Sequence, residues 1–311
     1  MLGVMAGAFA RPLGESLSFL VLLLCVAACE LTEVTLADPA DLVIAEIVLR
    51  ADAPIQLAFL HRTLGNAASL EEPGARIVVT DERGEEMLFS EVSPEVCLED
   101  ASAGTKVGTC YSTHDPPFPI RRGGTYAIRI DLAGGGTLTG RTRVPGDFSI
   151  RTPVASMCRL EADRTIEIRW TRSEGSWVYV SEAKIAGLRA ALSKRGVMLQ
   201  DEPARFLGLA ISAQDTTLVF PSELGLFDRA DPDLADALIA IRGGLPADVA
   251  AEFVVAAADR NYVNWVRGGQ FNPSGIVQIP SLVGEGTGVF GSIAVERRMM
   301  LTTESALPPC N

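Results

Sequence analysis

The sequence predicts an all-β protein with two β-sandwich-like domains, the first immunoglobulin- or transthyretin-like and the second fibronectin-III-like, with short helical insertions. Three observations support this fold class. Short segments rich in β-branched or alternating apolar residues recur, and turn signals separate them about every 8 to 15 residues. Of the 311 residues, the 283 that follow residue 28 are long for one domain and sufficient for two. A strand ending in Trp170, then a turn and a second aromatic strand, is typical of fibronectin-type sandwiches.

The first domain is expected to span residues 41–150. Segment 81–84, Asp-Glu-Arg-Gly, indicates a tight turn between two strands, and the glycines at 134–136 indicate a second turn. On both sides of these turns, β-branched residues cluster or alternate with polar ones. The expected strands are 42–49, 56–60, 76–80, 86–90, 125–131 and 137–142.

The second domain is expected to span residues 151–311 and to contain both strands and helices. Asp231 can cap a helix, Pro232 suits its first position, and the glycine pair at 243–244 ends it. A shorter helix is expected within 184–194. The expected strands are 165–170, 177–180, 251–256 and 289–295.

The N-terminal segment has the pattern of a bacterial lipoprotein signal. Its apolar run is too short for a membrane span and ends in Val-Ala-Ala-Cys, with the cysteine at position 29. We therefore expect residues 1–28 to be a signal peptide, Cys29 to be acylated, and residues 29–40 to be a tether. A plain secretory signal is the alternative. In lipoproteins, an aspartate after the acylated cysteine is the usual signal for retention in the inner membrane. Glu30 occupies that position here, which favours the outer membrane but does not indicate whether the protein faces the periplasm or the cell surface.

Charge and cysteine content narrow the class of partner. The net charge of -12 repels phosphates and excludes nucleic-acid binding, so membrane contact should come from the lipid.

Four cysteines remain once Cys25 leaves with the signal and Cys29 is acylated. Exported chains are oxidised, and four cysteines allow three pairings. We expect the pairs Cys97–Cys110 and Cys158–Cys310.

No motif assigns a catalytic residue, a metal or a cofactor. Residues 286–291 match Gly-x-Gly-x-x-Gly, but a strand follows in place of the helix of a dinucleotide site, so we expect a loop feeding the last strand. His61 and His114 are isolated, which favours surface or structural roles. The aspartates of segment 228–236 lack the spacing of a calcium loop, and helix capping explains them, with adventitious calcium as the alternative.

One segment concentrates aromatic and planar polar residues, a pattern that suits recognition of a sugar, a peptide or a partner loop. The glycines at 268 and 269 indicate an exposed turn there. In the alternative interpretation, the aromatic rings pack into the end of the sandwich core and the polar groups belong to a solvated loop. The predicted recognition residues are Arg260, Tyr262, Trp265, Arg267, Gln270 and Phe271.

The order of several motifs resembles an uncharacterised bacterial outer-membrane lipoprotein family, domain of unknown function 4249. The C-terminal motifs are Asp-Arg-Asn-Tyr at 259–262, Asn-Pro at 272–273 and Gly-Thr-Gly-Val-Phe-Gly-Ser at 286–292. The N-terminal half resembles it at 73–84 and 123–128. The cysteines and the helix near 231–242 depart from the pattern. The resemblance implies an outer-membrane lipoprotein that accompanies TonB-dependent transporters, and it supplies no catalytic residues.

These observations together predict a non-enzymatic binding or accessory protein, anchored by lipid in the outer membrane and helping a transporter to capture an unidentified ligand. A hydrolase acting on an exported polymer is the alternative from another class. It would need a carboxylate pair or an activated serine in one pocket. A purely structural envelope protein is the third possibility.

Overall fold

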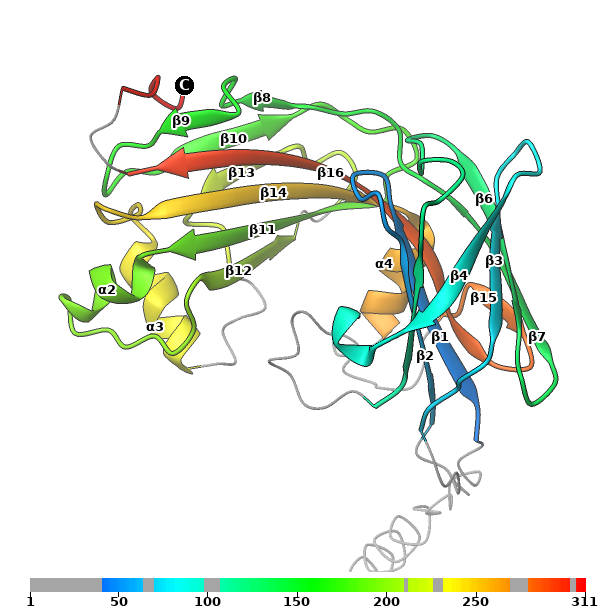
Figure 1. Cartoon of the computed structure of the whole chain (residues 1–311). Helices are drawn as coiled ribbons and strands as arrows, with labels where there is room; N and C mark the ends of the chain where they lie inside the picture. Colours follow the sequence, from blue (N-terminus) through cyan, green and yellow to red (C-terminus); the bar gives the residue numbers. More distant parts are fainter. Residues whose placement is uncertain are drawn as a thin grey trace, which may run out of the picture. The chain divides into compact units, whose positions relative to one another are not determined.

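The computed structural model describes residues 41–63, 70–97, 107–209, 212–225, 232–268, 279–302 and 306–311. Residues Ala40–Asn311 form one compact unit (Figure 1). The predicted signal peptide, Cys29 and the predicted tether lie outside the described residues. Within them, no helix has the length and apolar character needed to cross a membrane.

Strands dominate the described part of the chain, which confirms the predicted all-β class. The first half contains β1 (Val43–Arg50), β2 (Leu57–Arg62), β3 (Arg76–Thr80), β4 (Glu86–Val92), β5 (Thr109–Thr113), β6 (Thr125–Asp131) and β7 (Thr137–Arg143). The second half contains β8 (Ile150–Thr152), β9 (Met157–Arg159), β10 (Ile166–Trp170), β11 (Val178–Ala186), β12 (Ala204–Leu209), β13 (Thr217–Phe220), β14 (Ala250–Ala258), β15 (Leu282–Gly284) and β16 (Thr287–Leu301).

Helices are short in this fold. They are η1 (Pro94–Val96), α2 (Leu188–Ser193), α3 (Pro232–Ile241) and α4 (Arg260–Gly268). The helix expected at 231–242 is therefore confirmed as α3. The helix expected at 184–194 is correct only from Leu188, because residues up to Ala186 extend β11 and pair with β12 and β14. Strand pairing on both sides outweighs the local helical pattern there.

Two sheets are formed by the described strands. The larger has the order β12-β11-β14-β16-β1-β2-β5-β4-β3-β6-β7-β15, with β9 also beside β16, and the smaller has the order β13-β10-β8. Most neighbours are antiparallel, as expected for sandwiches. An exception is the pair β1 and β16, which run parallel from Ile44 opposite Thr287 to Arg50 opposite Ile293.

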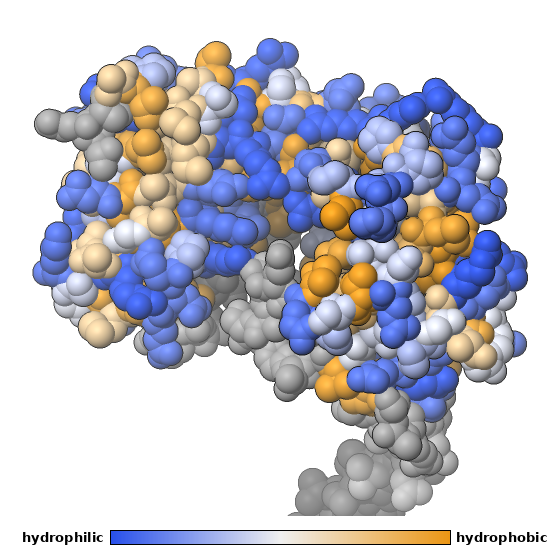
Figure 2. Space-filling model, in the orientation of Figure 1, coloured by the Kyte–Doolittle hydropathy of each residue, from blue (hydrophilic) through white to orange (hydrophobic). Residues whose placement is uncertain are grey.

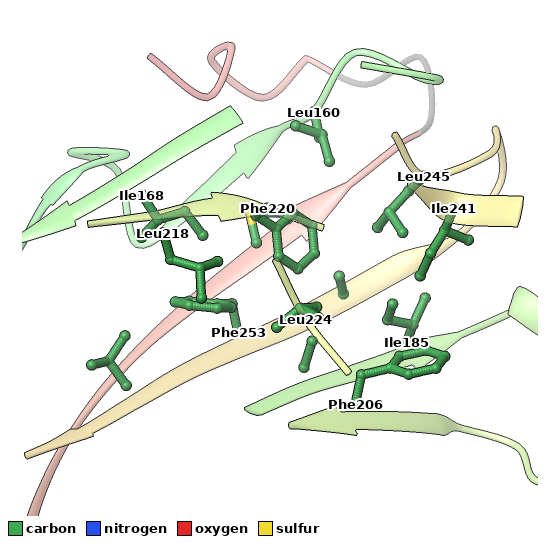
Figure 3. Packing of buried hydrophobic residues seen from close by; sticks show 14 of the residues in the cluster. Leu160, Ile168, Ile185, Phe206, Leu218, Phe220, Leu224, Ile241, Leu245 and Phe253 are labelled. Atoms are coloured by element: carbon green, nitrogen blue, oxygen red, sulfur yellow. The ribbon is translucent and has the colours of Figure 1, made fainter. Parts of the chain in front are cut away.

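The described residues form two large hydrophobic cores. The first is lined by β1 to β7 and is completed by Leu282 and Phe290 from the far end of the chain. The second lies between the β12-β11-β14-β16 layer and the three-stranded sheet. Figure 3 shows Phe220 of the small sheet near Phe253 of β14, and their rings pack edge to face with centroids 5.6 Å apart.

One strand, β16, contributes to both cores. Its first half pairs with β1, and from Ile293 to Leu301 it pairs with β14 (Figure 1). Phe290 is buried in the first core, and Ala294 and Met300 are buried in the second. The two sandwiches are therefore joined through a continuous backbone ladder.

The loop expected at 286–291 is wrong from Thr287 onward, because these residues already belong to β16. Gly288 has a positive φ of 139°, and a Cβ atom there would collide with the carbonyl oxygen of Ala45 in β1. A Cβ atom on Gly291 would lie 2.9 Å from the backbone nitrogen of Tyr262 in α4. These glycines permit close backbone approach inside a strand, which local sequence alone does not reveal.

Both predicted disulfides are confirmed. Cys97 follows η1 and joins Cys110 of β5, with Cα atoms 5.8 Å apart. Cys158 of β9 joins Cys310 near the C-terminus, with Cα atoms 5.0 Å apart. The first bridge is local, whereas the second ties the beginning of the second core to the end of the chain.

Candidate functional site

The buried carboxylate of Asp259 links three elements at the start of α4. Its Oδ1 accepts hydrogen bonds from the backbone nitrogens of Tyr262, at 2.9 Å, and Ser292, at 3.1 Å. Its Oδ2 accepts a hydrogen bond from the Thr142 hydroxyl at 2.7 Å. Asp259 therefore caps α4 and connects it to β7 and β16.

Asn261 makes a second link between the same elements. Its side-chain Nδ2 donates to the carbonyl oxygens of Arg141 at 2.7 Å and of Phe290 at 2.9 Å. A single amide thus joins the backbones of β7 and β16 beyond the end of β14. Asp259 and Asn261, two members of the Asp-Arg-Asn-Tyr motif, have a structural role here.

Burial raises the pKa of Asp259, because the carboxylate is only 5% exposed, and the hydrogen bonds from Thr142 and from the backbone of Tyr262 and Ser292 only partly offset this effect. The Ser292 hydroxyl lies 2.8 Å from that of Thr142, and both residues are buried. The two histidines of the chain lie elsewhere, in β2 and after β5. No imidazole therefore activates these hydroxyls, and the cluster serves to hold the elements together.

A pocket of about 260 Å³ lies beside this linkage. It is shallow, and its lining is drawn from β6, β7, the turn before β11 and the start of α4. The side chains that characterise it are Thr125, Arg141, Arg143, Trp177, Arg260 and Asn261.

An aromatic ring and a cation are stacked in this pocket. Trp177 is 46% exposed, which is unusual for so large an apolar side chain. The guanidinium carbon of Arg260 lies 5.0 Å from the centre of the Trp177 ring, a cation–π geometry. The backbone nitrogen of Trp177 donates to the carbonyl of Ala258 at 2.8 Å, so the ring is held at the end of β14.

Positive charge gathers around the same ring. Arg141 and Arg143 alternate along β7 and are both exposed, which places them on one face of the strand. Arg143 is paired with Glu174 at 3.1 Å. Within the part of the chain that the structure describes, no ion pair is formed by Arg141 or Arg260. A chain of net charge -12 therefore carries a locally cationic pocket.

The structure separates the residues of the predicted recognition segment. Residues Arg260–Gly268 form α4, and the exposed turn expected at 268 and 269 stays a prediction, because residue 269 lies outside the described residues. Arg260 faces the pocket, whereas Tyr262 packs against Val178 and Ala258, and burial raises the pKa of its hydroxyl. Trp265 is half-buried and is not part of the pocket lining.

Of the remaining predicted recognition residues, Gln270 and Phe271 lie outside the described residues, as does the side chain of Arg267.

Sequence reasoning missed Trp177, Arg141 and Arg143 as candidate site residues. The visible signals were an aromatic residue after a Ser-Glu-Gly turn and alternating arginines on one strand. Each is common alone, and only the pairing of distant strands brings them together.

Other predicted features have ordinary surroundings. His61 lies beside Phe59, with ring centroids 5.6 Å apart, and exposed His114 lies 3.5 Å from the carboxylate of Asp115. Among the described residues, no group of three His, Cys, Asp or Glu side chains could hold a metal ion. Asp228 and Asp231 of the predicted acidic cluster lie outside the described residues.

Two other surface features are less specific. A larger cavity of about 560 Å³ adjoins Cys310 and is lined by Arg159, Glu161 and Asp248, but no aromatic ring contributes to it. On the face drawn in Figure 2, leaving aside the grey residues, hydrophilic side chains break the apolar surface into separate groups. The Trp177 pocket is therefore the site with the most distinctive chemistry.

Comparison with known proteins finds no match by sequence and only weak matches by structure. No family model and no curated protein matches the sequence. Among solved structures, a DUF4785 family protein from Legionella pneumophila subsp. pneumophila str. Philadelphia 1 is 8% identical, with a TM-score of 0.22 over 68% of this chain and 51% of that one. This chain thus spans about half the length of that protein.

Two further similar structures contain fibronectin or immunoglobulin domains. The FN1-FN3 domains of chicken CNTN1 are 11% identical, with a TM-score of 0.19 over 84% of this chain and 66% of that one. The IG1+IG2 domains of DIP-gamma are 11% identical, with a TM-score of 0.18 over 83% of this chain and 98% of that one. TM-scores this low carry no argument about fold or function.

Proposed function

We propose that this protein is a lipid-anchored binding protein of the bacterial outer membrane, which captures a ligand at the Trp177 pocket as an accessory to an outer-membrane transporter. The observation that carries the binding role is the pocket itself, where an exposed tryptophan and a stacked arginine meet Arg141, which forms no ion pair with any residue that the structure describes. Tryptophan and arginine are the residue types that most often dominate binding energy.

The rigidity of the pocket supports a binding role. Asp259 and Asn261 flank Arg260 in sequence, and both are hydrogen-bonded to β7 and β16. A side chain presented from such a framework loses less conformational freedom when a ligand binds. The hydroxyls of Thr142 and Ser292 are buried: that of Thr142 donates to Asp259, and that of Ser292 lies 2.8 Å from that of Thr142. Neither is free to act as a nucleophile, which favours binding over hydrolysis.

The anchoring role rests on the apolar run ending in Cys29 and on the family resemblance. Acyl chains on this cysteine would hold the compact unit at the membrane surface, since several chains on one residue bind far more stably than one. The motifs that carry this resemblance lie in both halves of the chain, at 73–84 and 123–128 and between 259 and 292.

The binding role is tested with matched tryptophan variants. The soluble Cys29→Ala protein is immobilised and incubated with the soluble glycan and peptide fraction of a bacterial envelope extract, and retained species are measured by mass spectrometry. Trp177→Ala should reduce retention about 30-fold, corresponding to roughly 2 kcal/mol, while Trp265→Ala should retain as much as the parent. Equal retention by Trp177→Ala and the parent would refute the binding role.

The anchoring role is tested in the same strain by detergent partitioning. The native chain should enter the detergent phase and Cys29→Ala the aqueous phase. If Cys29→Ala partitions as the native chain does, the lipid anchor is refuted independently of the pocket.

A further inference from the structure

Resting on the proposed binding function, we infer that the Trp177 pocket recognises a single carboxylate-bearing sugar ring, one acidic residue of a polysaccharide chain. The inference depends on the unpaired charge of the pocket, the exposed indole ring and the small volume. Each observation excludes a different class of ligand.

Unpaired charge points to an anionic ligand. The acidic side chains near the pocket already have partners. Glu174 pairs with Arg143, and Glu82 accepts a hydrogen bond from the backbone of Thr125 at 3.1 Å. The carboxylate of Asp259 accepts hydrogen bonds from Thr142 and from the backbone of Tyr262 and Ser292. Arg141 and Arg260 remain without a carboxylate among the described residues. Guanidinium groups bind carboxylates through two parallel hydrogen bonds, so a carboxylate is the natural complement.

The exposed indole ring of Trp177 points to a flat apolar face on the ligand. The C–H bonds on one side of a pyranose ring form such a face, and they carry slight positive charge that suits the negative face of an aromatic ring. Arg260 approaches the ring at 5.0 Å, so a carboxylate on the stacked sugar would lie within reach of a cation. An inorganic anion would use the arginines and leave the indole without a role.

The size of the pocket limits what enters it. Small-molecule sites usually measure about 300 to 1,000 Å³. At about 260 Å³ this pocket is below that range, so it holds one residue of a longer chain rather than a whole drug-sized ligand. Neighbouring sugars of the chain would lie on the surface outside it.

The test measures binding of a galacturonate pentasaccharide by titration calorimetry with the soluble Cys29→Ala protein. The matched ligand is the same pentasaccharide with its carboxylates reduced to alcohols. The acidic ligand should bind at least 10-fold more tightly than the neutral one, and added salt should weaken its binding. Arg141→Ala should reduce affinity at least 10-fold.

The matched protein control is Arg151→Ala, which removes an exposed arginine from β8 and should leave the affinity unchanged. Thermal unfolding checks that every variant is folded, and Arg141→Gln, which keeps most of the side-chain volume, repeats the test if Arg141→Ala is unstable. Equal affinity for the acidic and neutral pentasaccharides would overturn the inference. Equal affinity for pentaglutamate, again dependent on Arg141, would assign the pocket to acidic peptides and overturn the sugar.

The two proposals fail in different ways. If the pentasaccharide does not bind while Trp177→Ala still loses retention of envelope material, the ligand class is wrong and the binding function stands. If Trp177→Ala retains that material as the parent does, the binding function itself is wrong.

Discussion

The two sandwiches bury similar cores but are held together by different kinds of connection. The first is built from consecutive strands and carries a local disulfide, whose cysteines are 13 residues apart. The second is closed by a disulfide between residues 152 positions apart. Neither core is complete without β16, because Phe290 fills the first and Met300 the second. Local and long-range connections therefore stabilise one continuous unit, and their contributions can be separated.

The largest expected difference concerns the disulfides. In the chain-entropy model, closing a longer loop removes more freedom from the unfolded chain. Replacing Cys158 and Cys310 together with serine should lower the free energy of unfolding by about 5 kcal/mol, against about 3 kcal/mol for the pair Cys97 and Cys110. Urea unfolding of the two double variants measures both values. A larger loss from the local pair would show that native packing, rather than loop length, sets the contribution.

A somewhat smaller effect tests the shared strand. Phe290→Ala should destabilise the first core and Phe253→Ala the second, each by about 4 kcal/mol, because both rings are fully buried. Since β16 belongs to both cores, each variant should shift one common unfolding transition. Scanning calorimetry detects this directly. If Phe290→Ala produced a separate early transition and left the other at its original temperature, the sandwiches would be independent domains.

The smallest expected effect concerns two aspartates, Asp52 and Asp259, whose pKa values are shifted in opposite directions. Burial tends to raise the pKa of Asp52, but hydrogen bonds from Arg50 and Arg297 outweigh it and hold the pKa below the ordinary 3.8. Burial keeps the pKa of Asp259 above that value. Asp52 therefore stabilises the fold above about pH 4, and this contribution is lost as pH falls through its lowered pKa. For Asp259, stability falls as pH rises from about 4 through its raised pKa.

Asparagine variants measure these two contributions. Asp52→Asn should reduce the fall in the free energy of unfolding below pH 4. The reduction should be about 1 kcal/mol or less, because the ion pairs lie near the surface. Asp259→Asn should instead remove the fall in the free energy of unfolding that occurs above pH 4. Urea unfolding between pH 2.5 and 7 in each variant checks the sign. If the free energy of unfolding of Asp52→Asn falls below pH 4 as steeply as that of the parent, the ion pairs of Asp52 add no net stability.

Local sequence patterns predicted the strands that have one buried and one exposed face. The alternation in Thr125–Asp131 places Tyr126, Ile128 and Ile130 in the core, so its period of two is visible in the letters. The strand Thr109–Thr113 was missed because all five residues are buried and four of them bear a hydroxyl group, which leaves no alternation of apolar and polar residues. Its cysteine indicated a disulfide loop instead.

The candidate site also has one part that the sequence predicted and another that only the structure revealed. Residue types and charge predicted Arg260 as a recognition residue, and disulfide chemistry predicted both cysteine pairs. The recognition role of Arg260 and of Trp265 stays a prediction. The sequence does not show which tryptophan lies beside Arg260. Helix α4 turns Trp265 away from the pocket lining, while the turn before β11 leaves Trp177 beside Arg260.

By itself, the sequence determined the all-β class, the helix near 231–242, both disulfides and the acidic charge, since these follow from local periodicity, capping and composition. Only the tertiary structure decided that β16 joins two cores and that Arg141, Trp177 and Arg260 share one pocket. The physical reason is that strand pairing joins residues far apart in the chain. The partner of each strand is chosen by the packing of the whole core, including the glycines that let β1 and α4 approach β16.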